Sequence, residues 1–239
     1  MGAYTALDTP ASTLEAISEM VGSVRIEPAD ASAAITLPEG SLVAGWYRAV
    51  VDGTTELSLS DFGPFEILFR TPTGNWSSSR SGTDANAWEL TTGMPGAPDG
   101  ASIRIAGVDR VYADPCAGTL GPPVEASVSA LADAMASIPV TIVTERSVVH
   151  LRYSTAEHIV LMIPRQLPCS PPDFNLWYDD IGGPRVASAA GSKIRLWIFN
   201  PNDRFGFGRI VIEAETYAGA TAALEQEVWQ TVLSISHGG

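Results

Sequence analysis

The segment WYDD at residues 177–180 holds the acidic pair best suited to chemistry. Two aromatic rings beside two carboxylates, in a stretch bounded by glycine and proline, suit the binding of a sugar ring or a cation. Adjacent Asp179 and Asp180 point apart in an extended chain, however, whereas glycoside hydrolysis needs two carboxylates that converge across one cleft. The simpler interpretation is a loop that Trp177 and Tyr178 anchor to a sheet, with both acids in solvent.

Two further tryptophans, Trp76 and Trp88, lie within residues 73–100, a stretch rich in Gly, Ser, Thr, Asn and Pro. That composition predicts a long, partly ordered loop. The two rings either line a groove or pin the loop to the fold, and the sequence favours neither. The expected ligand contacts are therefore Trp76, Trp88, Trp177, Tyr178, Asp179 and Asp180.

Catalytic signatures are missing from the sequence. There is no GxSxG, HExxH, GxGxxG or P-loop pattern. His150 and His158 alternate into apolar runs, which is typical of strand residues with satisfied rings rather than of general bases. We therefore expect no catalytic residue, no metal site and no cofactor. Glu213 joins Asp179 and Asp180 only under the alternative that the chain is a hydrolase acting on envelope glycans.

The two cysteines, Cys116 and Cys169, each follow a strand-like run and sit beside prolines, in ADPC and LPCSPP. Two cysteines without a third ligand nearby make a poor tetrahedral metal site, and neither has the surroundings of a catalytic thiol. A single disulfide is the favoured interpretation, and two ordinary buried thiols are the alternative. A disulfide would place the protein outside the cytoplasm. Residues 1–24 lack the pattern of a signal peptide, so a leader would be absent from this chain.

Composition limits the partners. The 239 residues carry a formal net charge of −13, with a sequence pI near 4.5. Nucleic acids and anionic membrane surfaces are bound through an excess of Lys and Arg, so we expect neither as a partner of this chain. Apolar runs such as HIVLMIP (158–164) have strand length, and no run is long enough to span a membrane. The partner is expected to be an unidentified envelope ligand or protein.

The chain shows alternating strand patterns and two helical patterns. One helix enters at Pro122 and Pro123 and stops at Pro139, and another spans about 219–235. Along the chain these patterns follow the order strands–helix–strands–helix. That order predicts an α+β fold, in which helices pack on an antiparallel sheet. Residues 1–40 are expected to form an N-terminal helix and an irregular lead-in, and 41–239 one α+β domain. Expected strand segments are 45–53, 54–60, 64–72, 102–114, 140–155, 158–164, and a hairpin of 193–199 with 209–217.

Several segments of the chain resemble those of a known protein family. RVYADPC, PPVEASVSALADAM, KIRLWIFN and ALEQEVWQTVLSI resemble a family of uncharacterised actinobacterial extracytoplasmic, lipoprotein-like proteins over roughly residues 60–235. More distantly, the order of elements is similar to that of PsbP-like domains, which include envelope lipoproteins that act as binding or assembly factors. The resemblance implies a PsbP-like sandwich and no activity that can be transferred.

We therefore expect a non-catalytic, extracytoplasmic domain of an actinobacterial-type envelope protein, secreted or envelope-anchored, that binds a ligand or partner. One alternative is the glycan-directed hydrolase with loop carboxylates. The other is a structural or assembly module of an envelope complex, which a large exposed apolar patch around Trp76 and Trp88 would mark.

Overall fold

The computed structural model describes residues 34–51, 65–73, 75–81, 87–151, 154–170, 173–179, 183–200 and 209–237. They belong to the unit Ala34–Gly239 and form sixteen strands and two helices. The expected N-terminal helix and the expected strand 54–60 lie outside the described residues.

An eight-stranded sheet, here called the central sheet, is antiparallel throughout. The expected hairpin of 193–199 with 209–217 is confirmed, with Trp197 opposite Ile212. Its second strand, IVIEAET, is buried on both faces, although it carries Glu213 and Glu215. The strands, in their order across the sheet, are β10 (Ile142–His150), β11 (Thr155–Met162), β14 (Lys193–Phe199), β15 (Ile210–Thr216), β7 (Ala101–Ala106), β6 (Ala87–Thr92), β5 (Trp76–Ser81) and β2 (Gly40–Ser41).

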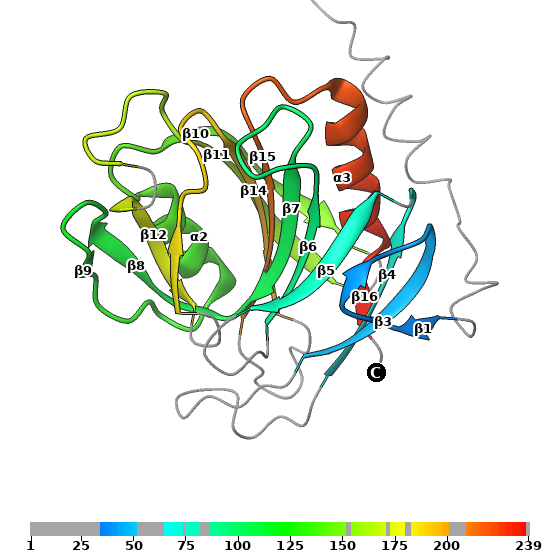
Figure 1. The fold of residues 1–239 in the computed structure, drawn as a ribbon. Coiled ribbons are helices and arrows are strands. Elements are labelled where there is room, and N and C mark those ends of the chain that lie inside the picture. Colours follow the sequence, from blue (N-terminus) through cyan, green and yellow to red (C-terminus); the bar gives the residue numbers. More distant parts are fainter. Residues whose placement is uncertain are drawn as a thin grey trace, which may run out of the picture. The chain divides into compact units, whose positions relative to one another are not determined.

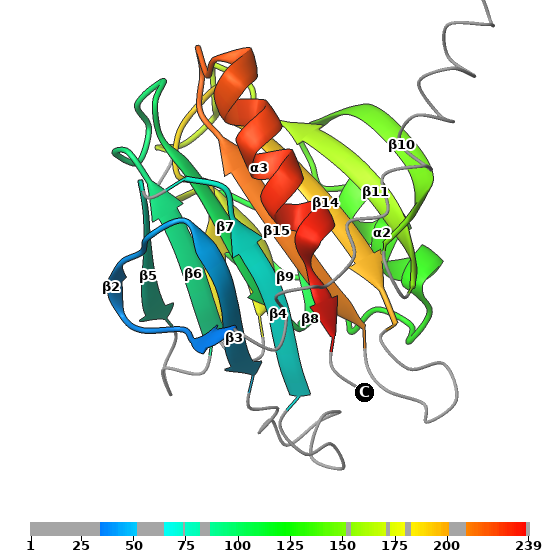
Figure 2. The same cartoon turned by 90° about the vertical axis from the view of Figure 1, so that its right-hand side faces the viewer.

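One face of the central sheet is covered by α3 (Ala222–Ser234) and by a four-stranded sheet, as Figures 1 and 2 show. Thr221 caps α3, its hydroxyl accepting from the Leu224 N–H at 3.2 Å. The core on this side includes Tyr47, Phe69 and Trp197. The strands of the covering sheet are β1 (Ile35–Thr36), β3 (Gly45–Val51), β4 (Phe65–Thr71) and β16 (Ser236–His237).

The opposite face is covered by α2 (Val128–Ala136) and by a third sheet, here called the outer sheet (Figure 1). Leu131 and Met135 of α2 pack with Leu176 and Leu196 in a second core. The helix begins after its cap Ser127, later than Pro122 and Pro123 led us to expect. The strands of the outer sheet are β13 (Gly183–Val186), β12 (Asn175–Asp179), β8 (Val108–Asp114) and β9 (Thr119–Leu120).

The predicted fold class, an α+β sandwich of PsbP-like type, is wrong. The protein is mostly β, and the predicted order of strands, helix, strands and helix is not seen. Two further sheets, each beside one helix, cover the central sheet, and the strand β16 follows α3. The physical reason is that an apolar strand face needs a cover but does not specify whether a helix or another sheet supplies it.

Three local predictions also need correction. The loop expected over 73–100 contains β5 and β6, which pair along their length with Trp76 opposite Thr92. The expected strand 102–114 is two strands in different sheets, separated at Gly107. The loop expected at WYDD is largely the strand β12, which pairs with both β8 and β13. Within residues 73–100, strand pairing overrides the turn propensity of Ser, Thr and Gly.

Candidate functional site

The predicted disulfide is confirmed: Cys116 and Cys169 are bonded, with their Cα atoms 5.7 Å apart. The bond joins the segment after β8 to the segment that leads into β12. Asp114 Oδ1 accepts from the N–H groups of Cys116 and Ala117 at 3.1 and 3.0 Å, and Asn175 Nδ2 donates to the Pro115 carbonyl at 3.0 Å. The disulfide thus fixes a hydrogen-bonded corner of the outer sheet.

A hollow of about 410 Å³ lies beside this bond, and we call it the disulfide pocket. Its walls are largely apolar, and one of them includes Val140, whose φ of 75° is unusual for a β-branched residue. The lining residues are Ala113, Asp114, Pro115, Cys116, Pro139, Val140, Pro168 and Phe174.

WYDD does not form the loop site that the sequence predicts. Trp177 is buried in the second core, which joins the outer sheet and α2 to the central sheet, and Tyr178 is half-buried in β12. Only the backbone of Asp179 is described, and Asp180 lies outside the described residues.

Trp76 and Trp88 are buried as well, on the opposite face of the central sheet. The Trp76 indole donates to Glu227 Oε1 at 2.7 Å, and the Trp88 indole donates to the Val50 carbonyl at 3.1 Å. The structure therefore does not bring these two rings together with Trp177. Because both rings are buried, they form no exposed apolar patch of the kind that would mark an assembly module.

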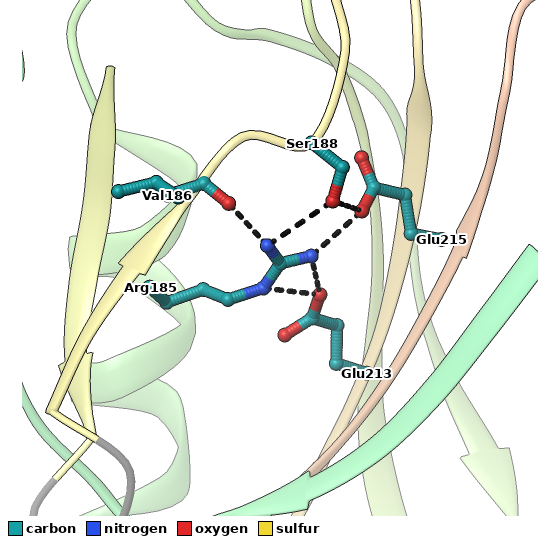
Figure 3. Close-up of polar contacts among 5 residues, drawn as sticks. All are labelled: Arg185, Val186, Ser188, Glu213 and Glu215. Carbon is teal, nitrogen blue, oxygen red and sulfur yellow. Dashed lines mark hydrogen bonds and ion pairs between the residues drawn. The ribbon is translucent and has the colours of Figure 1, made fainter. Parts of the chain in front are cut away.

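A buried ion cluster ties the outer sheet to the central sheet (Figure 3). Arg185 of β13 donates from Nε to Glu213 Oε1 at 2.7 Å and from Nη2 to Glu215 Oε2 at 2.7 Å. Arg185 also donates to the Val186 carbonyl, and Ser188 Oγ donates to Glu215 Oε2 at 2.6 Å. All three charged side chains are at most 6% exposed, so the cluster is sealed from solvent.

The electrostatics of this cluster favour a fixed ion pair over acid–base chemistry. Burial opposes the charge on Arg185, but Glu213 and Glu215 outweigh it, so the pKa of the guanidinium is raised. Arg104 of β7 lies opposite Glu213 in the ladder, so a second arginine shares a face of the sheet with Glu213. Glu213 was a candidate catalytic carboxylate under the hydrolase alternative. It is buried and forms an ion pair with Arg185.

His158 of β11 lies buried between two indoles on the α3 side of the central sheet. Its ring centroid is 4.9 Å from that of Trp197 and 5.5 Å from that of Trp229. Nδ1 is 3.4 Å from Glu145 Oε1, without the geometry of a hydrogen bond. Burial lowers the pKa of His158, Arg195 lowers it further, and Glu145 opposes them. His158 is a strand residue as expected, but its ring nitrogens have no hydrogen-bond partner among the described residues.

A second hollow, of about 480 Å³, opens where β11 and β15 end and β14 begins, and we call it the sheet-end pocket. Its walls combine apolar side chains with two cations and one acid, none of which the sequence reasoning singled out. The lining residues are Ile142, Thr144, Met162, Ile163, Pro164, Arg165, Gly191, Lys193, Thr216, Tyr217, Ala218, Gly219, Ala220 and Glu225.

The acid of the sheet-end pocket is held by cations. Lys193 Nζ lies 2.6 Å from Glu225 Oε1, and Arg195 Nη2 lies 2.9 Å from Glu225 Oε2. Burial alone would raise the pKa of Glu225, but the two cations outweigh it and the pKa is lowered. Glu225 therefore stays ionised near neutral pH and is poorly suited to donating a proton. This arrangement is better suited to binding than to acid–base catalysis.

The sequence offered one signal for each of these two charged sites. Glu213 and Glu215 alternate in the apolar run IVIEAET, so they share one face of a buried strand. Two acids on a buried face require a cation partner. Lys193, the single lysine of the chain, stands at the start of an apolar strand. Neither signal identifies the partner, which is Arg185 for the two glutamates and Glu225 for Lys193.

Metal and membrane features were searched over the described residues. No group of three or more His, Cys, Asp or Glu in them is placed to hold a metal ion. None of their helices is long and apolar enough to cross a membrane.

The comparisons with known proteins give no relative for this chain. No protein-family model matches it, and neither a curated protein nor a solved structure shows significant similarity to it.

Proposed function

We propose that the chain is a non-catalytic, extracytoplasmic domain of an actinobacterial-type envelope protein, secreted or envelope-anchored, that binds a ligand in the sheet-end pocket. The observation that carries the proposal is the pocket itself, whose lining is largely apolar and includes a few charged groups. Ligand sites in proteins commonly have this composition, with the polar groups fixing the orientation of the ligand.

The extracytoplasmic part of the proposal is supported by the bond between Cys116 and Cys169. Disulfides form and persist in oxidising compartments and are rare in the cytosol. The actinobacterial part is supported only by the resemblance of segments such as RVYADPC and KIRLWIFN.

The two alternatives have less support. The hydrolase needs two carboxylates that converge across an open cleft, and the sheet-end pocket is lined by one, Glu225. Glu213 is paired with Arg185 in the interior. The assembly module was expected to expose Trp76 and Trp88, which are buried.

A matched pair of variants tests where ligands bind. Ala220→Phe places a ring in the sheet-end pocket, since Ala220 is half-buried and lines it. Ala126→Phe adds the same ring at an exposed position before α2 that does not line the pocket. Fragments of neutral, cationic and anionic character are screened by ligand-observed NMR. We expect hits on the wild type and on Ala126→Phe that are lost on Ala220→Phe. Hits that survive Ala220→Phe, or the absence of hits on the wild type, would contradict the proposal.

A further inference from the structure

We propose that the sheet-end pocket binds a small organic monocarboxylate with an apolar body, and that Arg165 receives the carboxylate. This inference rests on the proposed function, because it names the class of ligand for the same pocket. Arg165 is exposed and lines the pocket in the segment that follows β11.

The position of Arg165 depends on Gly191. Gly191 has a φ of +79°, and a Cβ built there would lie 3.3 Å from the Cγ of Arg165. The missing side chain therefore leaves room for the stem of Arg165 to lie against the Gly191 backbone. Two backbone hydrogen bonds hold these segments together: Ile163 N donates to the Ser192 carbonyl at 2.9 Å, and Gly191 N donates to the Ile163 carbonyl at 3.0 Å. The stem is thus placed by the fold, and the guanidinium extends from a fixed base.

The local charge leaves Arg165 available for a ligand. Lys193 and Arg195 share Glu225, the one acid that lines the pocket. Arg165 forms no ion pair with any residue in the described part of the chain. The pocket lining therefore carries two cations and one acid, although the chain as a whole has a formal net charge of −13. An anion is the ligand that this excess favours.

The shape of the Arg165 guanidinium and the apolar walls of the pocket indicate which class of anion binds. A guanidinium presents a planar fork of donors that matches a carboxylate in a two-bond arrangement. The walls next to it are largely apolar and include Ile142, Met162 and Tyr217. Burying an apolar body there adds to the affinity, whereas a bare hydrated anion gains nothing from these walls. A carboxylate on an apolar body uses both parts of the pocket.

The test compares two ligands that differ in charge and share their apolar body. Hydrocinnamate and its neutral amide are titrated into isotope-labelled, oxidised protein, and each Kd is measured by NMR. A hydrogen bond to a charged group contributes roughly 1.5–3 kcal/mol, which corresponds to about a tenfold change in Kd or more. We therefore expect hydrocinnamate to bind at least about tenfold more tightly than the amide.

Variants assign the effect to Arg165. Arg165→Gln should weaken hydrocinnamate binding by at least about tenfold and leave the amide unchanged. Arg165→Lys, which keeps the charge but loses the fork, should fall between the wild type and Arg165→Gln. Arg70→Gln is the control, because Arg70 is an exposed arginine of β4 that does not line the pocket. It should leave both Kd values unchanged.

Four results would overturn the inference. They are equal Kd values for hydrocinnamate and its amide, no effect of Arg165→Gln, no binding of hydrocinnamate at all, or inorganic phosphate that binds as tightly as hydrocinnamate. The proposed function fails separately: it fails if the fragment screen gives no hits on the wild type, or if the hits survive Ala220→Phe.

Discussion

Arg185 and Glu213 join two sheets through a buried hydrogen bond of 2.7 Å between Nε and Oε1. Arg185 belongs to β13 of the outer sheet, and Glu213 belongs to β15 of the central sheet. Glu215 accepts from the same guanidinium, so one cation holds two carboxylates in the interior. The cluster therefore fixes how the outer sheet lies on the central sheet.

Removal of that cation should destabilise the protein strongly. Arg185→Met leaves two carboxylates buried without their partner, which typically costs 3–5 kcal/mol, and we expect a loss of about that size. Urea unfolding near pH 7 measures it. Arg185→Met combined with Glu213→Gln and Glu215→Gln should recover part of the loss, because no buried carboxylate is then left without its cation. If Arg185→Met unfolds at the same urea concentration as the exposed control Arg70→Met, the cluster does not hold the sheets together.

The disulfide should contribute substantially to stability. It closes a loop with a sequence separation of 53. In the chain-entropy model a loop of this length is worth roughly 4 kcal/mol. We expect Cys116→Ser combined with Cys169→Ser to lower the free energy of unfolding by about that amount. Thiol titration of the exported, denatured protein should give two thiols only after reduction. Two thiols without reduction would show that the bond does not form.

His158 should make stability fall on mild acidification. Burial lowers its pKa in the folded protein, so the unfolded chain takes up the proton first, near the ordinary value of about 6.5. The contribution of the neutral ring is therefore complete above that pH and is lost as the pH falls toward the lower folded-state pKa. His158→Phe keeps a ring between Trp197 and Trp229 and removes the proton. The wild type should lose more stability between about pH 7 and pH 5 than His158→Phe does. Equal losses would show that His158 titrates as it does in the unfolded chain.

Glu227 should stabilise the fold through Trp76. Its Oε1 accepts the Trp76 indole N–H at 2.7 Å and also accepts from the Thr73 hydroxyl. Glu227→Ala leaves the buried indole N–H unpaired, which costs about 1–3 kcal/mol. Glu227→Gln keeps an acceptor and should lose less. Gln230→Ala, at an exposed position of α3, is the control and should be nearly neutral in urea unfolding.

Local patterns in the sequence predicted some of the local structure, such as one hairpin and the disulfide, and missed other parts. The hairpin of β14 and β15 followed from two alternating runs that lie close together in the chain. The disulfide followed from counting cysteines and excluding other uses for them. The prediction of a loop at WSSSRS was wrong. Its serines are typical of turns, but the stretch pairs with β6 and is therefore a strand. Propensity is a weak guide where pairing with a neighbouring strand decides the outcome.

The sites depend on contacts between distant segments. Arg185 meets Glu213 and Glu215 across 28 and 30 positions, and nothing in the sequence near β13 marks that partner. The sheet-end pocket takes residues from Ile142 to Glu225, so its composition becomes visible only once the strands are in register. WYDD and the two tryptophans of β5 and β6 were prominent in the sequence because they are large. Large aromatic residues are more often core than ligand contacts, and Trp76, Trp88 and Trp177 are core here.

The most direct test of the proposed site is to map where hydrocinnamate binds. The amide signals of oxidised, isotope-labelled protein are followed during a titration. Binding in the sheet-end pocket predicts that the signals of Gly191, Lys193 and Gly219 move together, while those of Cys116 and Val140 stay in place. Movement confined to Cys116 and Val140 would assign the ligand to the disulfide pocket and contradict the account.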